Sequence, residues 1–440
     1  MKLNWFTPLP PARTEIAADA ARLLPALAAR AAVTLWTNQE DWDDALERHA
    51  EVRRYAPERP PWHELNRADA TLYSLGNDPR FHSSVWQVSR RHAGFVVLHD
   101  LKLQHLFAGI YRELLGDREG YLSLMESHYG AAGRRDARDF WRGRLSTEDI
   151  ADRYPLTALA VEGALGVFVH TEEAFAWVRD ETGLPVARAP LSFAATRRHG
   201  RERAARLRGT RPPFRLILFG HLHSNRRVDE LLLALAELPE REQFRLDIYG
   251  RLWDERHVAS AVAAHGLEGL VTIHGFVDAD VLEAALRRAH LAVNLRYPTM
   301  GEASGSQLRI WDHALPSLVT RVGDYARLPE DAVAHVRPER EVEDIQTHLR
   351  AFLADPARFA AMGERGRLRL ERWHAPEAYA DALLGLVSRA PEFGRRATAR
   401  ELAARAGTHL GLWTNADPAD DGDDFSRLAA RVCQLLALSC

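Results

Sequence analysis

Short apolar runs alternate with helical patterns along the first half of the chain. Between residues 16 and 27, apolar side chains recur at helical spacing, and Thr14 just before them is a suitable N-cap. The apolar runs predict buried strands at residues 3–6, 33–36, 70–75, 94–98 and 166–169. Strands that alternate with helices predict a parallel sheet with helices on both faces.

The same alternation restarts after residue 213. The expected strands are residues 214–219, 244–249, 270–274, 291–294 and 317–320, with helices at 229–237, 280–289 and across 340–390. We therefore predict an α/β protein with two Rossmann-like, doubly wound domains facing a cleft. The predicted divisions are an N-terminal domain (1–195), a linker (196–213), a C-terminal domain (214–390) and a helical C-terminal extension (391–440). Such domains bind ligands at the carboxyl ends of their strands.

Two segments outside these domains have a pattern of their own. Residues 197–211 are dense in arginine and are followed by Pro212 and Pro213. A solvated linker is the simpler interpretation, and contact with anionic lipid or phosphate is the alternative. The extension ends in a predicted helix whose apolar side chains form a face for docking onto the body of the protein; they are Phe425, Leu428, Val432, Leu435 and Leu436.

Composition narrows the classes of protein. The 440 residues allow two or three domains, and 46% hydrophobic with 27% charged residues is typical of a soluble globular enzyme. A net charge of -3 gives no reason to expect nucleic acid as a partner. The two cysteines, Cys433 and Cys440, exclude a disulfide scaffold and a cysteine-ligated zinc site. The two lysines, Lys2 and Lys102, lie outside any glycine-rich loop, which excludes a Walker-type nucleotide site.

Membrane and secretion signals are not evident in the sequence. The apolar start of the chain runs into Pro8, Pro10 and Pro11, and the longest apolar region is shorter than the ~20 residues that a spanning helix needs. We therefore expect a cytoplasmic protein. The arginine-rich linker leaves peripheral contact with the inner membrane face as an alternative.

One segment has the pattern of an anion site. The predicted strand ends at Asn294, a Pro/Gly turn follows, and Glu302 stands just before a helix that starts near Ser304. The free N–H groups of residues 304–306 and the helix dipole favour an anion such as a diphosphate. A carboxylate beside that anion suits a ligand that also presents hydroxyls, as a nucleotide-sugar does. From spacing alone, Glu302 as an ordinary first-turn residue is an equally good interpretation.

This segment also carries a family resemblance. Residues 295–308, continuing into 314–323, resemble the donor-site block of a bacterial branch of the retaining GT-B glycosyltransferases of family four, with its pattern LRYPTMGE. Other segments resemble the same family: residues 5–11 its first strand and loop, residues 75–79 and 97–101 its acceptor-domain motifs, and residues 167–171 its strand before the linker. Together these matches extend the resemblance over roughly residues 1–390. The resemblance implies the GT-B fold.

The resemblance assigns roles residue by residue. Glu302 falls on the donor glutamate that bonds hydroxyls of the transferred sugar, and His99 falls on the histidine at the reaction centre. His221 and Arg226 fall on the basic pair that contacts the diphosphate. The other donor-side positions are Phe276, Ala303, Ser304, Gly305 and Arg309, and the acceptor-side positions are Arg13, Asn77 and Asp100.

Three positions depart from the family's pattern. His221 replaces an arginine and is mostly neutral at pH 7. The family's second glutamate, which binds the ribose, falls on Arg309 (or Ile310), and Asp312 one turn later is the candidate replacement. The Ser-Gly pair of the first loop is absent, which leaves Arg13 to meet a phosphate through its side chain.

The resemblance implies transfer of a sugar, with retention, from a nucleotide-diphosphate-sugar to a glycan, lipid-linked or protein acceptor. That co-substrate is the donor, and neither a metal nor a further cofactor is implied. A nucleotide-sugar epimerase and a non-catalytic GT-B scaffold are the alternatives, and the loss of the second glutamate and of the glycine in the first loop motivates the scaffold. A phosphorylase is excluded, because neither Lys2 nor Lys102 is placed to bind pyridoxal phosphate. The sugar, the base, the acceptor and the oligomeric state stay open.

Overall fold

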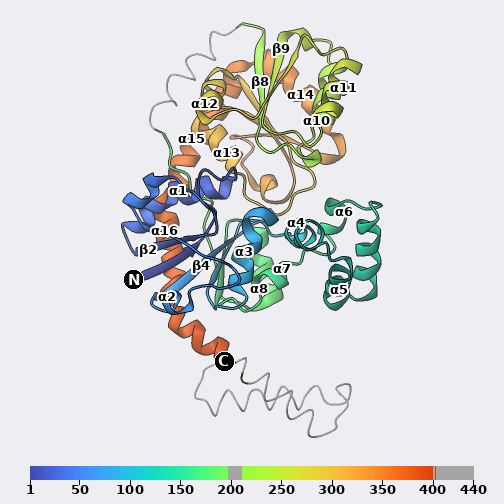
Figure 1. The fold of residues 1–440 in the computed structure, drawn as a ribbon. Helices are drawn as coiled ribbons and strands as arrows, with labels where there is room; N and C mark the ends of the chain where they lie inside the picture. The colour runs from blue at the N-terminus through green and yellow to red at the C-terminus, as the bar shows by residue number, and fades with distance from the viewer. Residues whose placement is uncertain (197–210, 400–401, 403–440) are drawn as a thin grey trace.

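The computed structural model describes residues 1–196, 211–399 and 402, which form two α/β domains stacked one on the other (Figure 1). The N-terminal domain holds a seven-stranded sheet of order β3-β2-β1-β4-β5-β6-β7. Its strands are β1 (Lys2–Phe6), β2 (Ala32–Thr37), β3 (Glu51–Arg54), β4 (Ala70–Leu75), β5 (Phe95–Leu98), β6 (Gly166–Val169) and β7 (Val186–Arg188). Every pair in this sheet is parallel, as the alternation of strands and helices predicts.

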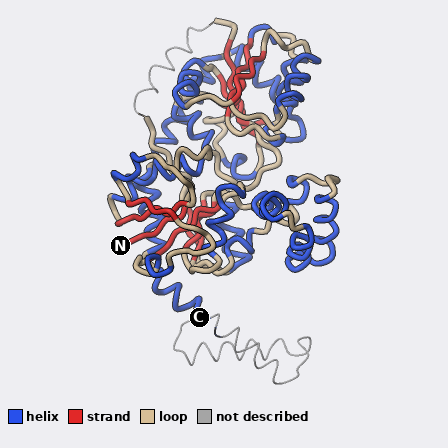
Figure 2. The backbone as a smooth tube through the Cα atoms, in the orientation of Figure 1, coloured by secondary structure: helices blue, strands red, loops and turns tan. Residues whose placement is uncertain are grey.

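The C-terminal domain holds a six-stranded sheet of order β10-β9-β8-β11-β12-β13, again wholly parallel. Its strands are β8 (Phe214–Phe219), β9 (Phe244–Tyr249), β10 (Val271–Gly275), β11 (Leu291–Asn294), β12 (Ser317–Thr320) and β13 (Ala334–Val336). In both domains the strands form a central layer between helices (Figure 2). The predicted class, two Rossmann-like α/β domains, is confirmed.

Helices cover both faces of each sheet. In the N-terminal domain they are α1 (Glu15–Ala28), α2 (Trp62–Leu65), α3 (Pro79–Ser89), α4 (Gln104–Gly109), α5 (Arg118–Trp141), α6 (Thr147–Ala151), α7 (Thr157–Val161) and α8 (Glu172–Thr182). After the linker follow α10 (Val228–Ala236), α11 (Glu255–Ala264), α12 (Ala279–Arg288), α13 (Gly305–Asp312), α14 (Glu341–Ala354), α15 (Pro356–Trp373) and α16 (Pro376–Val387). Helices α5 and α6 project to one side of the lower domain (Figure 1).

All ten strands expected from apolar runs are present, and three further strands are not anticipated by the sequence. The additional strands β3, β7 and β13 all lie at sheet edges. β3 reads Glu-Val-Arg-Arg and is partly or fully exposed, while β7 and β13 are three residues long. An edge strand has one unpaired side and needs no continuous apolar run, so its sequence carries a weak signal.

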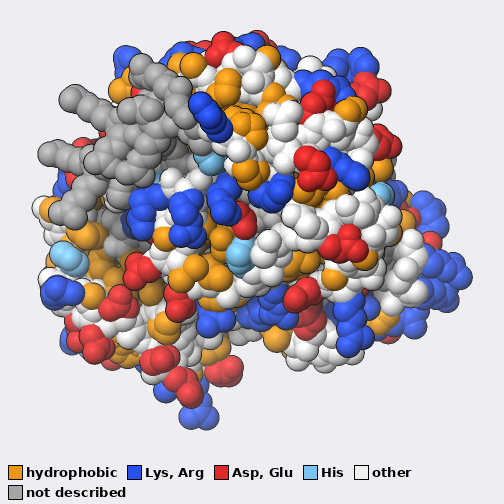
Figure 3. Space-filling view, turned by 90° about the horizontal axis from the view of Figure 1, so that it is seen from above, with side chains coloured by type: hydrophobic (Ala, Val, Ile, Leu, Met, Phe, Trp, Pro, Cys, Tyr) orange, Lys and Arg blue, Asp and Glu red, His pale blue; other side chains and the backbone are white. Residues whose placement is uncertain are grey.

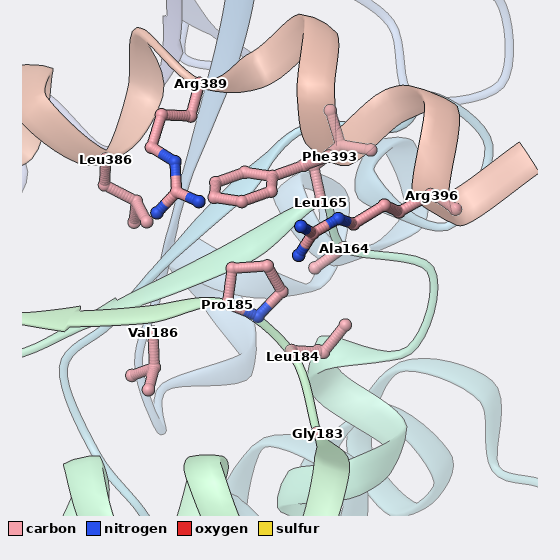
Figure 4. Close-up of a pocket in the computed structure, with 11 residues that line it drawn as sticks. Ala164, Leu165, Gly183, Leu184, Pro185, Val186, Leu386, Arg389, Phe393 and Arg396 are labelled. Carbon is pink, nitrogen blue, oxygen red and sulfur yellow. The ribbon is translucent and has the colours of Figure 1, made fainter. Parts of the chain in front are cut away.

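The end of the described chain returns to the N-terminal domain. Helix α16 packs beside α1 (Figure 1). The ring of Tyr379 in α16 also meets the ring of Phe168 in β6 edge-on, with centroids 5.0 Å apart. A further helical segment, residues 390–399, lays Phe393 against Phe95 and borders a cavity of about 270 Å³ beside Pro185 (Figure 4). The rest of the predicted extension and the arginine-rich part of the linker lie outside the described residues.

The surface is polar and mixed in charge. Seen from above, basic and acidic side chains share one face, with a row of basic side chains across its middle (Figure 3). Among the described helices, none is both long and apolar enough to cross a bilayer.

Candidate active site

A cleft of about 570 Å³ lies between the domains, at the carboxyl ends of both sheets. The N-terminal domain contributes the loops after β1, β4 and β5, and the C-terminal domain contributes the loop after β8 and residues 296–306. The predicted site residues on its wall are Arg13, Asn77, His99, Asp100, His221, Arg226, Glu302, Ala303, Ser304 and Gly305. Residues up to 292 positions apart in sequence thus meet at one cavity, as expected at the strand ends of doubly wound sheets.

Glu302 is held by four groups. Its Oε2 accepts hydrogen bonds from the Thr299 hydroxyl (2.9 Å) and the Met300 N–H (2.7 Å). Its Oε1 accepts one from the Tyr325 hydroxyl at 3.2 Å and pairs with Arg296 Nη1 at 2.7 Å. Burial opposes ionisation, but Arg296 and the hydrogen bonds outweigh it and lower the pKa of Glu302. The result is a charged, rigid carboxylate at the cleft wall.

The turn before Glu302 depends on a glycine. Gly301 has φ 74°, and a Cβ there would lie 2.5 Å from Leu101 Cβ, so the loop approaches the N-terminal domain closely. Helix α13 begins only at Gly305, with Ser304 as its N-cap accepting from the Gln307 N–H at 3.1 Å. Glu302 therefore lies before the first turn of the helix, and the interpretation as an ordinary first-turn residue is wrong.

Arg226 is a buried cation with spare donors. It ends the short helical turn η3 (Ser224–Arg226), is 2% exposed, and donates from Nη2 to the Phe219 carbonyl at 3.4 Å. Its Nε and Nη1 have no hydrogen-bond partner among the described residues. Burial, reinforced by the charge of Arg296, lowers the pKa of Arg226 to about 9, so it stays charged at neutral pH. A buried charge of this kind is costly without a counter-ion.

The start of α13 adds a second source of positive potential. The first N–H groups of a helix have no partner within the helix, and here they open into the cleft at Gly305 and Ser306. Gly220, in the loop that carries Arg226, approaches the same place, since a Cβ on it would lie 3.6 Å from Ser306 Oγ. One buried arginine, Arg226, one partly buried arginine, Arg296, and a helix start thus lie near one carboxylate, an arrangement that can bind an anion.

The N-terminal wall carries neutral and unpaired polar groups. His99 follows β5 and its ring lies 4.9 Å from that of His170; burial and then His170 hold its pKa well below the usual value. Asp100 accepts the Asn77 N–H at 2.9 Å, and burial, followed by the charge of Glu302, raises the pKa of Asp100 to about 7. The side-chain amide of Asn77 has no partner among the described residues. This wall can therefore bind hydroxyls.

The raised pKa of Asp100 predicts a pH effect on stability. Its pKa in the folded protein, about 7, exceeds the 3.8 of a free aspartate, so the folded state binds an extra proton between these limits. The free energy of unfolding should therefore fall as the pH rises through this window, by about 4 kcal/mol from this group. Urea unfolding measures this free energy at pH 5 and at pH 8. Its decrease between the two pH values should be smaller in Asp100→Asn than in the parent protein. Equal falls in both proteins would refute the assignment.

Two predicted donor residues lie off the cleft wall. Phe276 is 51% exposed, and the Arg13 guanidinium lies 4.2 Å above its ring. Arg309 points to α12, where its Nε lies 3.2 Å from Glu283 Oε1. His221 does line the cleft, and burial lowers its pKa, which leaves it neutral at pH 7.

The proposed replacement for the ribose-binding glutamate is wrong. Asp312 is 4% exposed, and its carboxylate accepts the Thr196 N–H at 2.8 Å and the Thr196 hydroxyl at 2.6 Å. Arg367 Nη1 lies 3.0 Å from the same carboxylate. Asp312 thus links Thr196, which lies between the two domains in sequence, to Arg367 of α15, and both of its carboxylate oxygens are used. The neighbouring Arg227 has a structural role, since it pairs with Glu230 and with Glu341 at 2.6 Å each.

Sequence reasoning missed Arg296 and Glu15 on the cleft wall, and Tyr325, which contacts Glu302. Arg296 stands inside the recognised block, where a second cation beside Glu302 was the available signal. Tyr325 comes from η5 (Gly323–Arg327), beyond the end of that block. Glu15, the first residue of α1 after the loop without the Ser-Gly pair, packs on the start of α13: a Cβ on Gly305 would lie 2.7 Å from Glu15 Cγ. No cluster of three or more potential metal ligands occurs among the described residues.

Comparisons with known proteins agree with this geometry. Residues 226–385 match a protein-family model described as "Glycosyl transferase-like". Sucrose-phosphate synthase from Thermosynechococcus elongatus is 17% identical with a TM-score of 0.61, over 88% of this chain and 98% of that one.

Two other solved structures are similar. HepE from Anabaena in complex with UDP-glucose is 16% identical with a TM-score of 0.57, over 88% of this chain and 99% of that one. WaaG, a glycosyltransferase involved in lipopolysaccharide biosynthesis, is 18% identical with a TM-score of 0.55, over 87% and 99%. No curated protein sequence matches significantly. The chain therefore has the GT-B fold, and its second half carries a glycosyl transferase-like domain.

Proposed function

We propose that this protein is a glycosyltransferase that moves a sugar from a nucleotide-diphosphate-sugar to an acceptor held by the N-terminal domain, with retention of configuration. The observation that carries the proposal is the buried guanidinium of Arg226 on the cleft wall, two of whose nitrogen donors have no hydrogen-bond partner among the described residues. A diphosphate would supply its missing counter-charge through charge-assisted hydrogen bonds. The structure of HepE with UDP-glucose, which has the same fold, supports this kind of donor.

The site suggests a division of labour. The diphosphate would lie between Arg226 and the first amides of α13, which stabilise the charge that grows on the leaving group. The sugar would lie between Glu302 and His99, with one of its hydroxyls taking the place of the longest hydrogen bond of Glu302, the 3.2 Å bond from the Tyr325 hydroxyl. Because burial keeps His99 neutral, it would act as a hydrogen-bonding group. Retention requires the acceptor oxygen to enter on the face that the diphosphate leaves, and close packing of both reactants in the cleft favours this step.

A non-catalytic GT-B protein that binds a nucleotide-sugar or another partner is the second candidate. The segment after Glu302 favours this candidate, because neither Arg309 nor Asp312 offers a free carboxylate that could bind a ribose. Arg309 pairs with Glu283, and Asp312 is engaged by Thr196 and Arg367. The epimerase alternative has no observation of its own in its favour.

A thermal-shift screen against UDP-, GDP-, ADP- and dTDP-sugars tests the proposal. One donor at 100 times its Kd should stabilise the protein by about 2.7 kcal/mol. That donor should then be hydrolysed slowly or transferred to an added acceptor, as detected by release of the nucleoside diphosphate. Stabilisation without turnover would favour the non-catalytic candidate, and no stabilisation by any of the four donors would refute both donor-binding functions.

The position of Glu15 predicts a variant with tighter donor binding. Its carboxylate lies against the start of α13 and would repel a diphosphate there. Replacement by glutamine should lower the Kd for the free nucleoside diphosphate about tenfold, since about 1.4 kcal/mol of repulsion is removed. Arg22 keeps its second partner, Asp19, so the loop should stay folded.

Isothermal titration calorimetry measures the effect of this change. Glu40→Gln is the matched control, because Glu40 is 89% exposed in its side chain and lies away from the cleft wall. Weaker binding in Glu15→Gln than in the control would mean that Glu15 assists the donor, and the assignment of repulsion would be wrong.

A further inference from the structure

A second cavity, here named the hinge pocket, lies on the other side of residues 302–304. Its volume is about 370 Å³, which is within the range of small-molecule sites. It adjoins the place where the chain crosses between the domains: the Phe193 N–H donates to the His374 carbonyl at 2.7 Å, and His374 Nδ1 lies 2.7 Å from the Leu191 carbonyl oxygen. Both domains contribute to its wall.

Three guanidinium groups from separate elements line the hinge pocket. Arg188 ends β7, Arg327 ends η5 and Arg369 lies near the end of α15. Arg188 pairs with Glu172 at 3.1 Å, whereas Arg327 and Arg369 form no ion pair within the described part of the chain. Asp324 lies on the same wall and is close enough to Arg188 and Arg327 for their charges to act on it, so one carboxylate is shared by these arginines. The planar guanidinium fork fits phosphate oxygens well, and a phosphate would add the missing negative charge.

The rest of the wall has the features of a sugar site. Trp373, at the end of α15, is 51% exposed and lines the pocket, and the Arg372 guanidinium lies 4.9 Å from its ring centroid. The carboxylates of Glu172 and Asp324 lie on the same wall and can accept hydrogen bonds from hydroxyls. An aromatic side chain together with carboxylates suits a sugar ring, which is apolar on one face and carries hydroxyls at its edge.

We propose that the hinge pocket binds a phosphorylated sugar, with its phosphate on Arg327 and Arg369 and its ring against Trp373. The hinge pocket shares His170, Leu191 and residues 302–304 with the wall of the donor cleft, but the residues assigned here to the phosphate and the ring line the hinge pocket alone. A ligand here would bridge the domains, because Arg188 and Glu172 belong to one and Arg327 and Trp373 to the other. It would also lie beside Tyr325, whose hydroxyl donates to Glu302, so that its binding is coupled to the donor site.

Calorimetry on the full chain tests the ligand class. The probes are a panel of hexose 6-phosphates and hexose 1-phosphates, with glucose, inorganic phosphate and dodecyl phosphate as comparisons. At least one hexose phosphate should bind ten or more times more tightly than glucose and than inorganic phosphate. The proposal is overturned if no hexose phosphate binds, if inorganic phosphate binds equally well, or if dodecyl phosphate binds more tightly, which would indicate a lipid phosphate.

Variants then locate the ligand. The double variant Arg327→Gln/Arg369→Gln should weaken hexose phosphate binding at least tenfold with an unchanged circular dichroism spectrum. Arg365→Gln is the matched control on the same helix, since Arg365 faces Asp331 at 3.4 Å and lies off the pocket wall. Arg226→Gln should also leave this affinity unchanged. If Arg226→Gln abolishes hexose phosphate binding and the double variant does not, the ligand lies in the donor cleft and the proposal fails.

Because these are binding measurements, they separate the hinge pocket from the donor cleft. Hexose phosphate binding that depends on Arg327 and Arg369 would support the hinge pocket even if no nucleotide-sugar binds. Donor binding without hexose phosphate binding would leave the proposed function standing and refute the hinge pocket.

Discussion

Replacing Arg226 by glutamine should raise the melting temperature of the free protein and weaken donor binding about 100-fold. The side chain is buried with two unpaired nitrogen donors, so the folded protein carries the cost of an uncompensated charge. Its lowered pKa, about 9, means that this cost is fully present at neutral pH and is relieved only in more alkaline solution. Removing it should stabilise the protein by about 1–3 kcal/mol. Losing two charge-assisted bonds to a diphosphate accounts for the weaker binding.

The adjacent arginine, Arg227, provides a control, because its replacement should change the melting temperature in the opposite direction. Arg227 pairs with Glu230 and with Glu341, which is 5% exposed. Arg227→Gln leaves that buried carboxylate without its partner and should lower the melting temperature while changing donor affinity little. Thermal unfolding without ligand and calorimetry with the nucleoside diphosphate measure both effects. A destabilised Arg226→Gln that still binds the donor normally would contradict the assignment of an anion site.

Replacing Glu302 by glutamine should reduce transfer by about 10²–10³-fold while donor affinity changes less than tenfold. The carboxylate is fixed by four groups and lines the cleft where the sugar is proposed to lie. Loss of one positioned charged group at a reacting centre typically has an effect of this size. Rates of nucleoside diphosphate release, with and without acceptor, measure the change.

The stability of this variant has to be followed in parallel. Glu302→Gln removes the partner of Arg296 and should lower the melting temperature, so rates are compared well below it. Tyr325→Phe, which removes only the 3.2 Å hydrogen bond to Oε1, should reduce transfer about tenfold or less. A Glu302→Gln enzyme with normal turnover would show that this carboxylate does not act on the sugar.

The parts of the fold that the sequence predicts well are those with a local signal. Buried strands such as β4 and β11 are continuous apolar runs, and the strand, turn and helix around Glu302 follow each other within about fifteen residues. The start of α13 follows from a single capping serine, Ser304, and the close approach that Gly305 permits. The position of the cleft then follows from the parallel arrangement of the strands.

The parts that the sequence does not predict depend on partners far away in the chain. Asp312 has the right spacing for a ligand-binding acid, but Arg367 and Thr196, 55 and 116 positions away, engage it instead. Arg309 is similarly directed to Glu283. Which face of a helix meets the cleft depends on such pairings, and spacing within the helix cannot supply them.

The hinge pocket is the extreme case of this dependence. Arg188, Arg327 and Arg369 are separated by 139 and 42 residues and share no motif. Each alone is an ordinary surface arginine. Only the folding of β7, η5 and α15 to one place gives them a joint role.

A crystal structure of the protein with the nucleotide-sugar that stabilises it most is the most direct test of the donor site. The account predicts diphosphate oxygens within hydrogen-bond distance of Arg226 and the amides of Gly305 and Ser306, with a sugar hydroxyl on Glu302. A nucleotide-sugar bound elsewhere, or in the cleft with Arg226 and Glu302 untouched, would contradict it.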